Sequence, residues 1–206
     1  MRNLLAGLLL TGVCLASPRQ LTIAVVDYAG LPGQEIAPAV ELARNAFHDA
    51  GIDAAWLVCH VVRGEFHGCT PPPDGRYVSM LVMAKMVAAP SGPAAEGDRA
   101  GFALVGYEAR QQPRAWAFYA AAKGMARKTG RPSWLVLGCV LVHEIGHVLG
   151  LQHRDGGIMG ARLTLREVDN GALGLMFNLA EGRQLRAGAS RLHQVLEPAL
   201  VAGAGR

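Results

Sequence analysis

Residues 143–153 read H-E-I-G-H-V-L-G-L-Q-H, and this stretch decides what kind of site the fold must build. An α-helix repeats every 3.6 residues, so His143 and His147 lie on one face and can bind the same metal ion. Glu144 lies three residues before His147, on the same side of the helix. Its carboxylate can therefore reach a water molecule on the metal without entering the coordination sphere.

The remainder of the stretch provides a third ligand. Gly150 tolerates a positive φ, which is how a helix ends and a chain turns back, and that turn can bring His153 to the same metal. Three protein ligands leave one tetrahedral position for water, the arrangement of a catalytic rather than a structural zinc site. The preceding residues, Ser133–Leu149, are apolar on almost every side, which predicts a buried helix with Ser133 as its N-cap.

With its glycine and third histidine, this motif resembles that of the metzincin metallopeptidases, whose signature continues into a methionine turn. The resemblance implies that His143, His147 and His153 are the zinc ligands and that Glu144 is the general base. It also implies that Met159, in D-G-G-I-M-G, is the methionine beneath the zinc. The H-E-I-G-H helix followed after a few residues by G-I-M resembles the same region of small bacterial matrixin-like proteins.

Two features depart from the family pattern. Only five residues separate His153 from Met159, and Gly160 stands where many members carry proline. Neither affects the three ligands, but both leave the geometry of the turn open. The alternative for Met159 is an ordinary buried methionine that fills space in the core.

The order of apolar segments predicts an α+β fold, and the resemblance makes it zincin-like. We expect a twisted mixed sheet of about five strands, a long active-site helix and C-terminal helices. The expected strands are Leu21–Asp27, Ala54–Cys59, Tyr77–Lys85, Phe102–Tyr107 and Ala115–Ala120, and the first two should pair in parallel through a helix at Glu35–Ala50. Ala88–Ala100 should be a loop, Lys123–Lys128 a helical turn, and Leu163–Leu185 one or two helices.

The first residues are typical of an export signal. Arg2 is followed by the apolar segment Leu4–Leu15, which is too short to span a bilayer comfortably, and small residues suit cleavage after Ala16. Residues 1–16 are therefore predicted to be a signal peptide for secretion or periplasmic export. Cys14 raises lipid anchoring as a less favoured alternative. Residues 17–206 should form a single catalytic domain with a tail from about residue 190 that could be flexible.

The predicted export determines what state we expect for the other cysteines. Cys59 and Cys69 flank a short polar loop, and in an oxidising compartment this spacing predicts a disulfide. Cys139, one turn before the first histidine of the motif, is predicted to be an inert core thiol. The alternative is a second, structural zinc site formed by Cys59, His60, His67 and Cys69, although this spacing matches no familiar zinc finger.

The balance of charge restricts the partners. The formal net charge is +4, with basic residues scattered rather than clustered, which argues against nucleic-acid binding. We expect a peptide or protein substrate, no membrane association after signal cleavage, and a monomer.

The predicted activity is that of a secreted zinc-dependent endopeptidase, in which Glu144 activates a zinc-bound water for attack on a peptide bond. By the same resemblance, the strand at Phe102–Tyr107 should be an edge strand that pairs with an extended substrate through Phe102, Ala103, Leu104 and Val105. The alternative is that this strand lies inside the sheet.

Other functions remain open at this stage. Glu167, twenty residues beyond His147, could be the third ligand in place of His153, as in the other large group of H-E-x-x-H enzymes. A second alternative is a non-catalytic secreted module that binds zinc or captures peptides. A third is a zinc hydrolase that acts on a non-peptide amide.

Overall fold

A computed structural model describes residues 21–72, 77–83, 100–104, 112–173 and 176–196. These residues form a six-stranded mixed sheet with the order β3-β2-β1-β4-β6-β5, and five helices. The strands are β1 (Leu21–Asp27), β2 (Ala54–Val62), β3 (Glu65–His67), β4 (Val78–Met83), β5 (Gly101–Leu104) and β6 (Arg114–Phe118). The helices are α1 (Gly33–Asp49), α2 (Tyr119–Thr129), α3 (Ser133–Val148), α4 (Leu165–Ala172) and α5 (Leu179–Leu196).

The centre of the sheet is parallel and its two edges are antiparallel. β1 pairs in parallel with β2 and β4, and β4 pairs in parallel with β6. The short strands β3 and β5 close the two sides in the antiparallel sense. The strand-helix-strand opening and the mixed sheet are therefore confirmed, and β3 is a sixth strand that the sequence did not predict.

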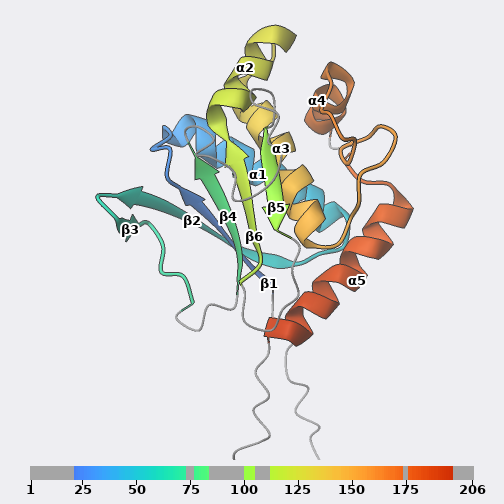
Figure 1. The fold of residues 1–206 in the computed structure, drawn as a ribbon, viewed down its shortest axis with the longest axis horizontal. Coiled ribbons are helices and arrows are strands. Elements are labelled where there is room, and N and C mark those ends of the chain that lie inside the picture. The colour runs from blue at the N-terminus through green and yellow to red at the C-terminus, as the bar shows by residue number, and fades with distance from the viewer. Residues whose placement is uncertain (1–20, 73–76, 84–99, 105–111, 174–175, 197–206) are drawn as a thin grey trace, which may run out of the picture.

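One face of the sheet carries the main core. Side chains such as Ile23, Val25 and Met80 are buried there together with the apolar faces of the helices, and Figure 1 shows α1 and α3 lying across this face. A smaller cluster around Ala24, Val26 and Cys59 occupies the opposite face. The burial of β1 on both sides explains why its sequence, LTIAVVD, is almost continuously apolar.

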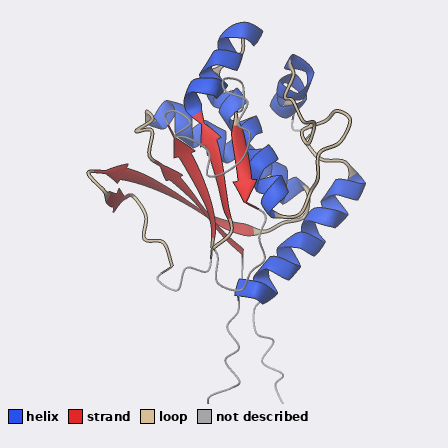
Figure 2. Ribbon diagram, viewed as in Figure 1, coloured by secondary structure: helices blue, strands red, loops and turns tan. Residues whose placement is uncertain are grey.

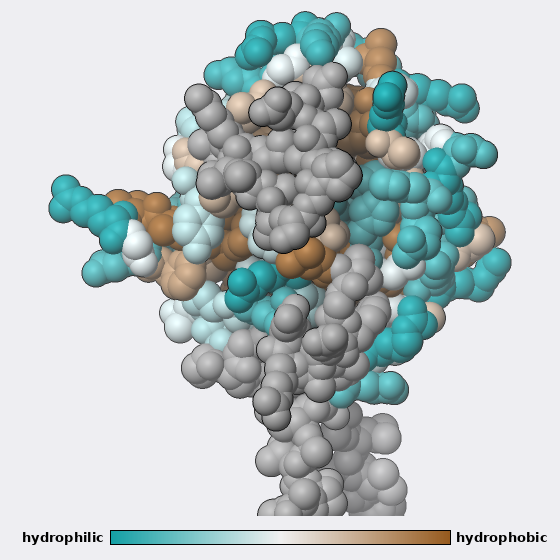
Figure 3. Space-filling model, in the orientation of Figure 1, coloured by the Kyte–Doolittle hydropathy of each residue, from teal (hydrophilic) through white to brown (hydrophobic). Residues whose placement is uncertain are grey.

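The hairpin of β2 and β3 extends beyond the helices, and Figures 1 and 2 show it at the left of the molecule. In the space-filling view of Figure 3 it projects from the body and mixes hydrophilic and hydrophobic residues. Cys59 and Cys69 form the predicted disulfide at its base, so these cysteines cannot ligate a second zinc ion. The structural zinc site considered from the sequence is therefore excluded.

Helix boundaries differ from the prediction at three places. α2 begins at Tyr119, because the run of alanines that follows favours helix. The sequence pattern instead predicts strand as far as Ala120 and a single helical turn at Lys123–Lys128. The N-cap of α3 is Pro132 and not Ser133, whose hydroxyl instead donates to the Glu35 carboxylate at 2.7 Å. α5 continues to Leu196, so residues 190–196, predicted as a possible tail, are helical.

Several predictions concern residues outside the described ranges: the signal peptide with Cys14, the loop at 88–99, and Val105–Tyr107 of the fourth predicted strand. Within the described ranges, no helix combines the length and apolar character that crossing a membrane requires.

Candidate metal centre

Three histidines converge at the end of α3. His143 and His147 lie one turn apart on the helix, and the chain then reverses at Gly150, which has a φ of 94°. This turn brings His153 back, so that one nitrogen from each of the three rings lies within 4.8 Å of the others. Their exposure increases along the sequence, from buried His143 through half-buried His147 to exposed His153. One side of the cluster is therefore buried in the core, and the other side is exposed to solvent.

Backbone carbonyls orient two of the three rings. The Nδ1 of His143 lies 2.7 Å from the carbonyl oxygen of Ile158, and the Nδ1 of His147 lies 2.8 Å from that of Leu151. A carbonyl oxygen can only accept, so each Nδ1 must carry the proton and each Nε2 is left with a free lone pair. This is the hydrogen-bonding pattern expected around metal-binding histidines.

The spacing of these nitrogens fits a zinc ion. The Nε2 of His143 is 3.0 Å from the Nε2 of His147 and 3.3 Å from that of His153. In a tetrahedral site with zinc–nitrogen bonds of about 2.05 Å, neighbouring nitrogens lie roughly 3.3 Å apart. Three neutral imidazoles with one open position are also the donor set of a catalytic zinc site.

Burial keeps the rings of His143 and His147 neutral. Burial lowers the pKa of His143 to about 4, assisted by His147 and His153 and opposed by the hydrogen bond to Ile158. Burial also lowers the pKa of His147, against the hydrogen bond to Leu151. At neutral pH, protons therefore compete little with a metal ion for these two nitrogens.

Glu144 is buried between α3 and the edge of the sheet. A Cβ atom added at Gly101, the first residue of β5, would lie 2.7 Å from both Cγ and Oε1 of Glu144 and 2.5 Å from the carbonyl oxygen of Trp116. Only glycine leaves the space that the Glu144 side chain occupies. The structure thus places the candidate general base against the start of the strand predicted to bind substrate, and no sequence pattern indicates this contact.

Among the described strands, β5 lies at the edge of the sheet and not inside it. It pairs with β6, and no strand among the described residues pairs with its other side. Phe102 stacks on Trp116 with ring centroids 4.4 Å apart, whereas Leu104 is exposed. Phe102, Ala103 and Leu104 therefore occupy an edge strand, while Val105 is outside the described residues.

Met159 lies below the histidine helix. Its side chain is fully buried, and a Cβ atom added at Gly146 would lie 2.8 Å from its Sδ. The short connection from His153 is possible because Gly156 and Gly157 both adopt positive φ values, 82° and 71°. The position agrees with a methionine turn, and that role remains a prediction.

Glu167 is occupied elsewhere. Its carboxylate accepts hydrogen bonds from the backbone and the hydroxyl of Thr164 in a capping box at the start of α4, and another from the backbone of Gly157. Burial raises the pKa of Glu167, but these hydrogen bonds outweigh it and the pKa lies below its usual range. Among the described residues, only the three histidines form a cluster of potential metal ligands, so Glu167 is not placed to be the third ligand. The T-L-R-E pattern was the sequence signal for this cap.

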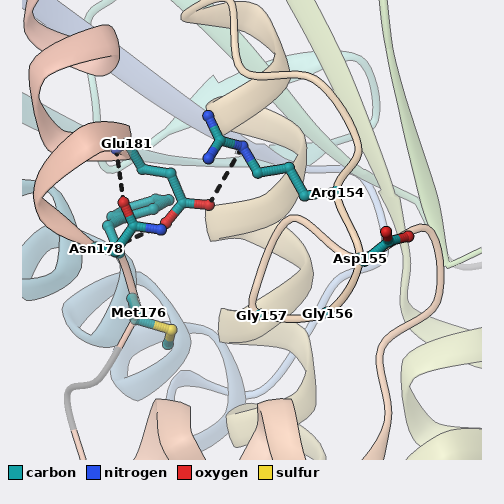
Figure 4. A pocket seen from close by; sticks show the side chains of 8 residues that line it. Arg154, Asp155, Gly156, Gly157, Met176, Asn178 and Glu181 are labelled. Carbon is teal, nitrogen blue, oxygen red and sulfur yellow. Dashed lines mark hydrogen bonds and ion pairs between the residues drawn. The ribbon is translucent and has the colours of Figure 1, made fainter.

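A pocket of about 500 Å³ lies between the segment that follows His153 and the start of α5, as Figure 4 shows. It is lined by Arg154, Asp155, Gly156, Gly157, Met176, Phe177, Asn178 and Glu181. None of the three histidines lines it, so this pocket is distinct from the candidate metal centre.

Comparison with known proteins supports the fold. No family model and no curated protein sequence matches the chain. Among solved structures it is similar to an archaemetzincin from Methanopyrus kandleri, with 18% identity, a TM-score of 0.52 and coverage of 85% of this chain and 100% of that one. It is also similar to a zinc-dependent peptidase from Methanocorpusculum labreanum, with 16% identity, a TM-score of 0.51 and coverage of 79% and 99%. The fold is therefore that of these zinc peptidases, whereas the matrixin-like type expected from the sequence remains a prediction.

Proposed function

We propose that this chain is an exported zinc-dependent endopeptidase in which Glu144 is the general base. The observation that carries the proposal is the convergence of three Nε2 atoms, 3.0 and 3.3 Å apart, beside a buried glutamate on the same helix. A purely structural zinc site has four protein ligands and no need of such a carboxylate. Similarity to two zinc peptidases of the same fold gives independent support.

The residues divide the work. His143, His147 and His153 would hold the ion, which when bound would acidify a water molecule and polarise the substrate carbonyl. Glu144 accepts a proton from the attacking water at its carboxylate and delivers it to the departing amine nitrogen. Its burial against Gly101 restricts its motion, so it stays close to the bond that breaks.

The substrate is an extended peptide. The side of β5 that has no partner strand among the described residues offers backbone donors and acceptors, and a peptide strand can pair with them in the manner of an added β-strand. Because the Glu144 side chain contacts the first residue of the same strand, a peptide paired with β5 would pass close to the general base. This proximity favours a peptide bond over a non-peptide amide as the target.

Export is the remaining part of the proposal. The disulfide between Cys59 and Cys69 suits an oxidising compartment, and the first sixteen residues have the pattern of a signal peptide. Mass spectrometry of protein recovered from the periplasm or medium of an expression host tests this point. A mature N-terminus at Ser17 is expected, and a chain that keeps its first residues inside the cell would contradict export.

The activity is tested with purified mature protein on a peptide library, together with metal analysis of the same sample. One zinc ion per chain and cleavage that a chelator abolishes are expected. Glu144→Gln removes the base and keeps the shape, so it should retain zinc and lose at least about a hundredfold in kcat/KM. Zinc binding without cleavage in the wild type would instead indicate a non-catalytic zinc-binding module.

A further inference from the structure

His153 is held differently from the other two ligands. Its side chain is exposed, and it lies on a turn rather than on the helix. The rings of His143 and His147 are each oriented by a carbonyl oxygen, but the hydrogen-bonding contact of the His153 ring within the described residues is with His143 itself. The position of His153 must therefore be set through its backbone, by whatever fixes the turn.

Gln184 on α5 contacts both ends of this turn. Its side-chain Nε2 donates to the carbonyl oxygen of Gly150 at 3.1 Å, where the helix ends. Its Oε1 accepts from Nη2 of Arg154 at 3.2 Å, one residue after His153. A single amide side chain thus joins the residue that starts the reversal to the residue that follows the ligand.

α5 is a firm support for this bridge. The backbone of Gly188 packs directly on Leu149, so closely that an added Cβ would lie 1.7 Å from the Leu149 carbonyl oxygen. Nε of Arg154 also lies 3.9 Å from Glu181, whose carboxylate accepts from the backbone of Asn178, as Figure 4 shows. The helix that carries Gln184 is therefore fixed to the end of α3 and to the turn.

We propose that Gln184 is a positioning residue for the third metal ligand, and that it holds His153 in place by tying Gly150 to Arg154. This inference rests on the metal-binding part of the proposed function and not on peptide hydrolysis. Loss of the bridge should loosen the turn and weaken the metal site chiefly by way of His153, because His147 is still held on α3. Residues that orient metal ligands typically contribute tenfold to a hundredfold to metal affinity.

The test compares Gln184→Met with Gln194→Met. Methionine keeps the unbranched shape of glutamine but cannot donate a hydrogen bond, and Gln194 is an exposed residue of the same helix. Zinc affinity is measured by competition with a chromophoric chelator, and the rate of zinc release is followed in the same assay. Gln184→Met should bind zinc tenfold to a hundredfold more weakly and release it faster, whereas Gln194→Met should match the wild type within twofold. Gln184→Ala takes its place if the methionine variant does not fold.

The same substitution in a His153→Ala background separates positioning from general damage. With the third ligand already removed, Gln184→Met should change the remaining zinc affinity by less than twofold. An equal loss in both backgrounds, or no loss in either, overturns the proposal. Wild-type protein that binds no zinc would overturn the proposed function as well, so the two failures are distinguishable.

Discussion

The packing of α5 on the end of α3 leads to a sharp prediction about two glycines. An alanine Cβ at Gly188 would lie 1.7 Å from the carbonyl oxygen of Leu149, and contacts between carbon and oxygen rarely fall much below about 3.3 Å. The two backbones would have to separate by roughly 1.5 Å. At Gly124, in the middle of α2, the same Cβ would meet only a side-chain nitrogen of Arg127 at 3.9 Å.

The two substitutions should change the free energy of unfolding in opposite directions. Replacing glycine by alanine inside a helix stabilises by about 1 kcal/mol when space is available, so Gly124→Ala should raise the free energy of unfolding by about that amount. At Gly188 the same gain is opposed by overpacking, which costs about 1–3 kcal/mol and more where backbone must move. Because backbone must move at Gly188, the upper end of this cost applies, so Gly188→Ala should lower the free energy of unfolding by about 2 kcal/mol and the two variants should differ by about 3 kcal/mol.

Urea denaturation of the metal-free protein, followed by circular dichroism, measures both variants against the wild type. The midpoint should rise for Gly124→Ala and fall for Gly188→Ala. A Gly188→Ala protein as stable as the wild type would show that α5 does not approach Leu149 as described. The packing of α5 that positions Gln184 beside the turn would then not exist as described.

Three further predictions concern the metal centre. The metal-free protein should lose about 3 kcal/mol of stability as the pH falls from about 6.5 to 4, because the unfolded chain binds a proton at His143 in this range whereas the folded chain, in which the pKa of His143 is about 4, does not. The urea midpoint measured across this range should depend less on pH in His143→Ala than in the wild type. His153→Ala should lose most of its bound zinc by metal analysis while Glu167→Ala keeps it and is destabilised by about 1 kcal/mol through loss of its cap; retention of zinc by the first and loss by the second would reverse the ligand assignment. Gly101→Ala should displace the Glu144 side chain and lower kcat/KM by about a hundredfold at unchanged zinc content, and full activity in this variant would mean that Glu144 is not constrained by β5.

Much of the candidate site could be predicted because its chemistry is local in sequence. The i, i+4 spacing of His143 and His147 and the glycine at position 150 specify a helix, a shared face and a reversal within eleven residues. The apolar composition of β1 and α3 likewise predicted their bounds almost to the residue. The prediction was wrong at Ser133, because its hydroxyl donates a hydrogen bond to the Glu35 carboxylate on α1 instead of capping α3.

Other features depend on contacts that no local pattern records. Nothing in the sequence around Gly101 indicates that the side chain of Glu144, forty-three residues later, occupies the space beside this glycine. A glutamine such as Gln184 is also common on any exposed helix, so its role cannot be predicted from its residue type. The carbonyl of Ile158 meets His143 from fifteen residues away, and Gln184 meets Gly150 from thirty-four.

The sequence by itself thus determined the donor set, the helix that carries it and the turn that completes it. Only the tertiary structure decided which strand borders Glu144, which carbonyls orient the rings and which helix supports the third ligand. The reason is physical: backbone periodicity fixes the relation of residues a few positions apart, whereas long-range contacts depend on how whole elements pack.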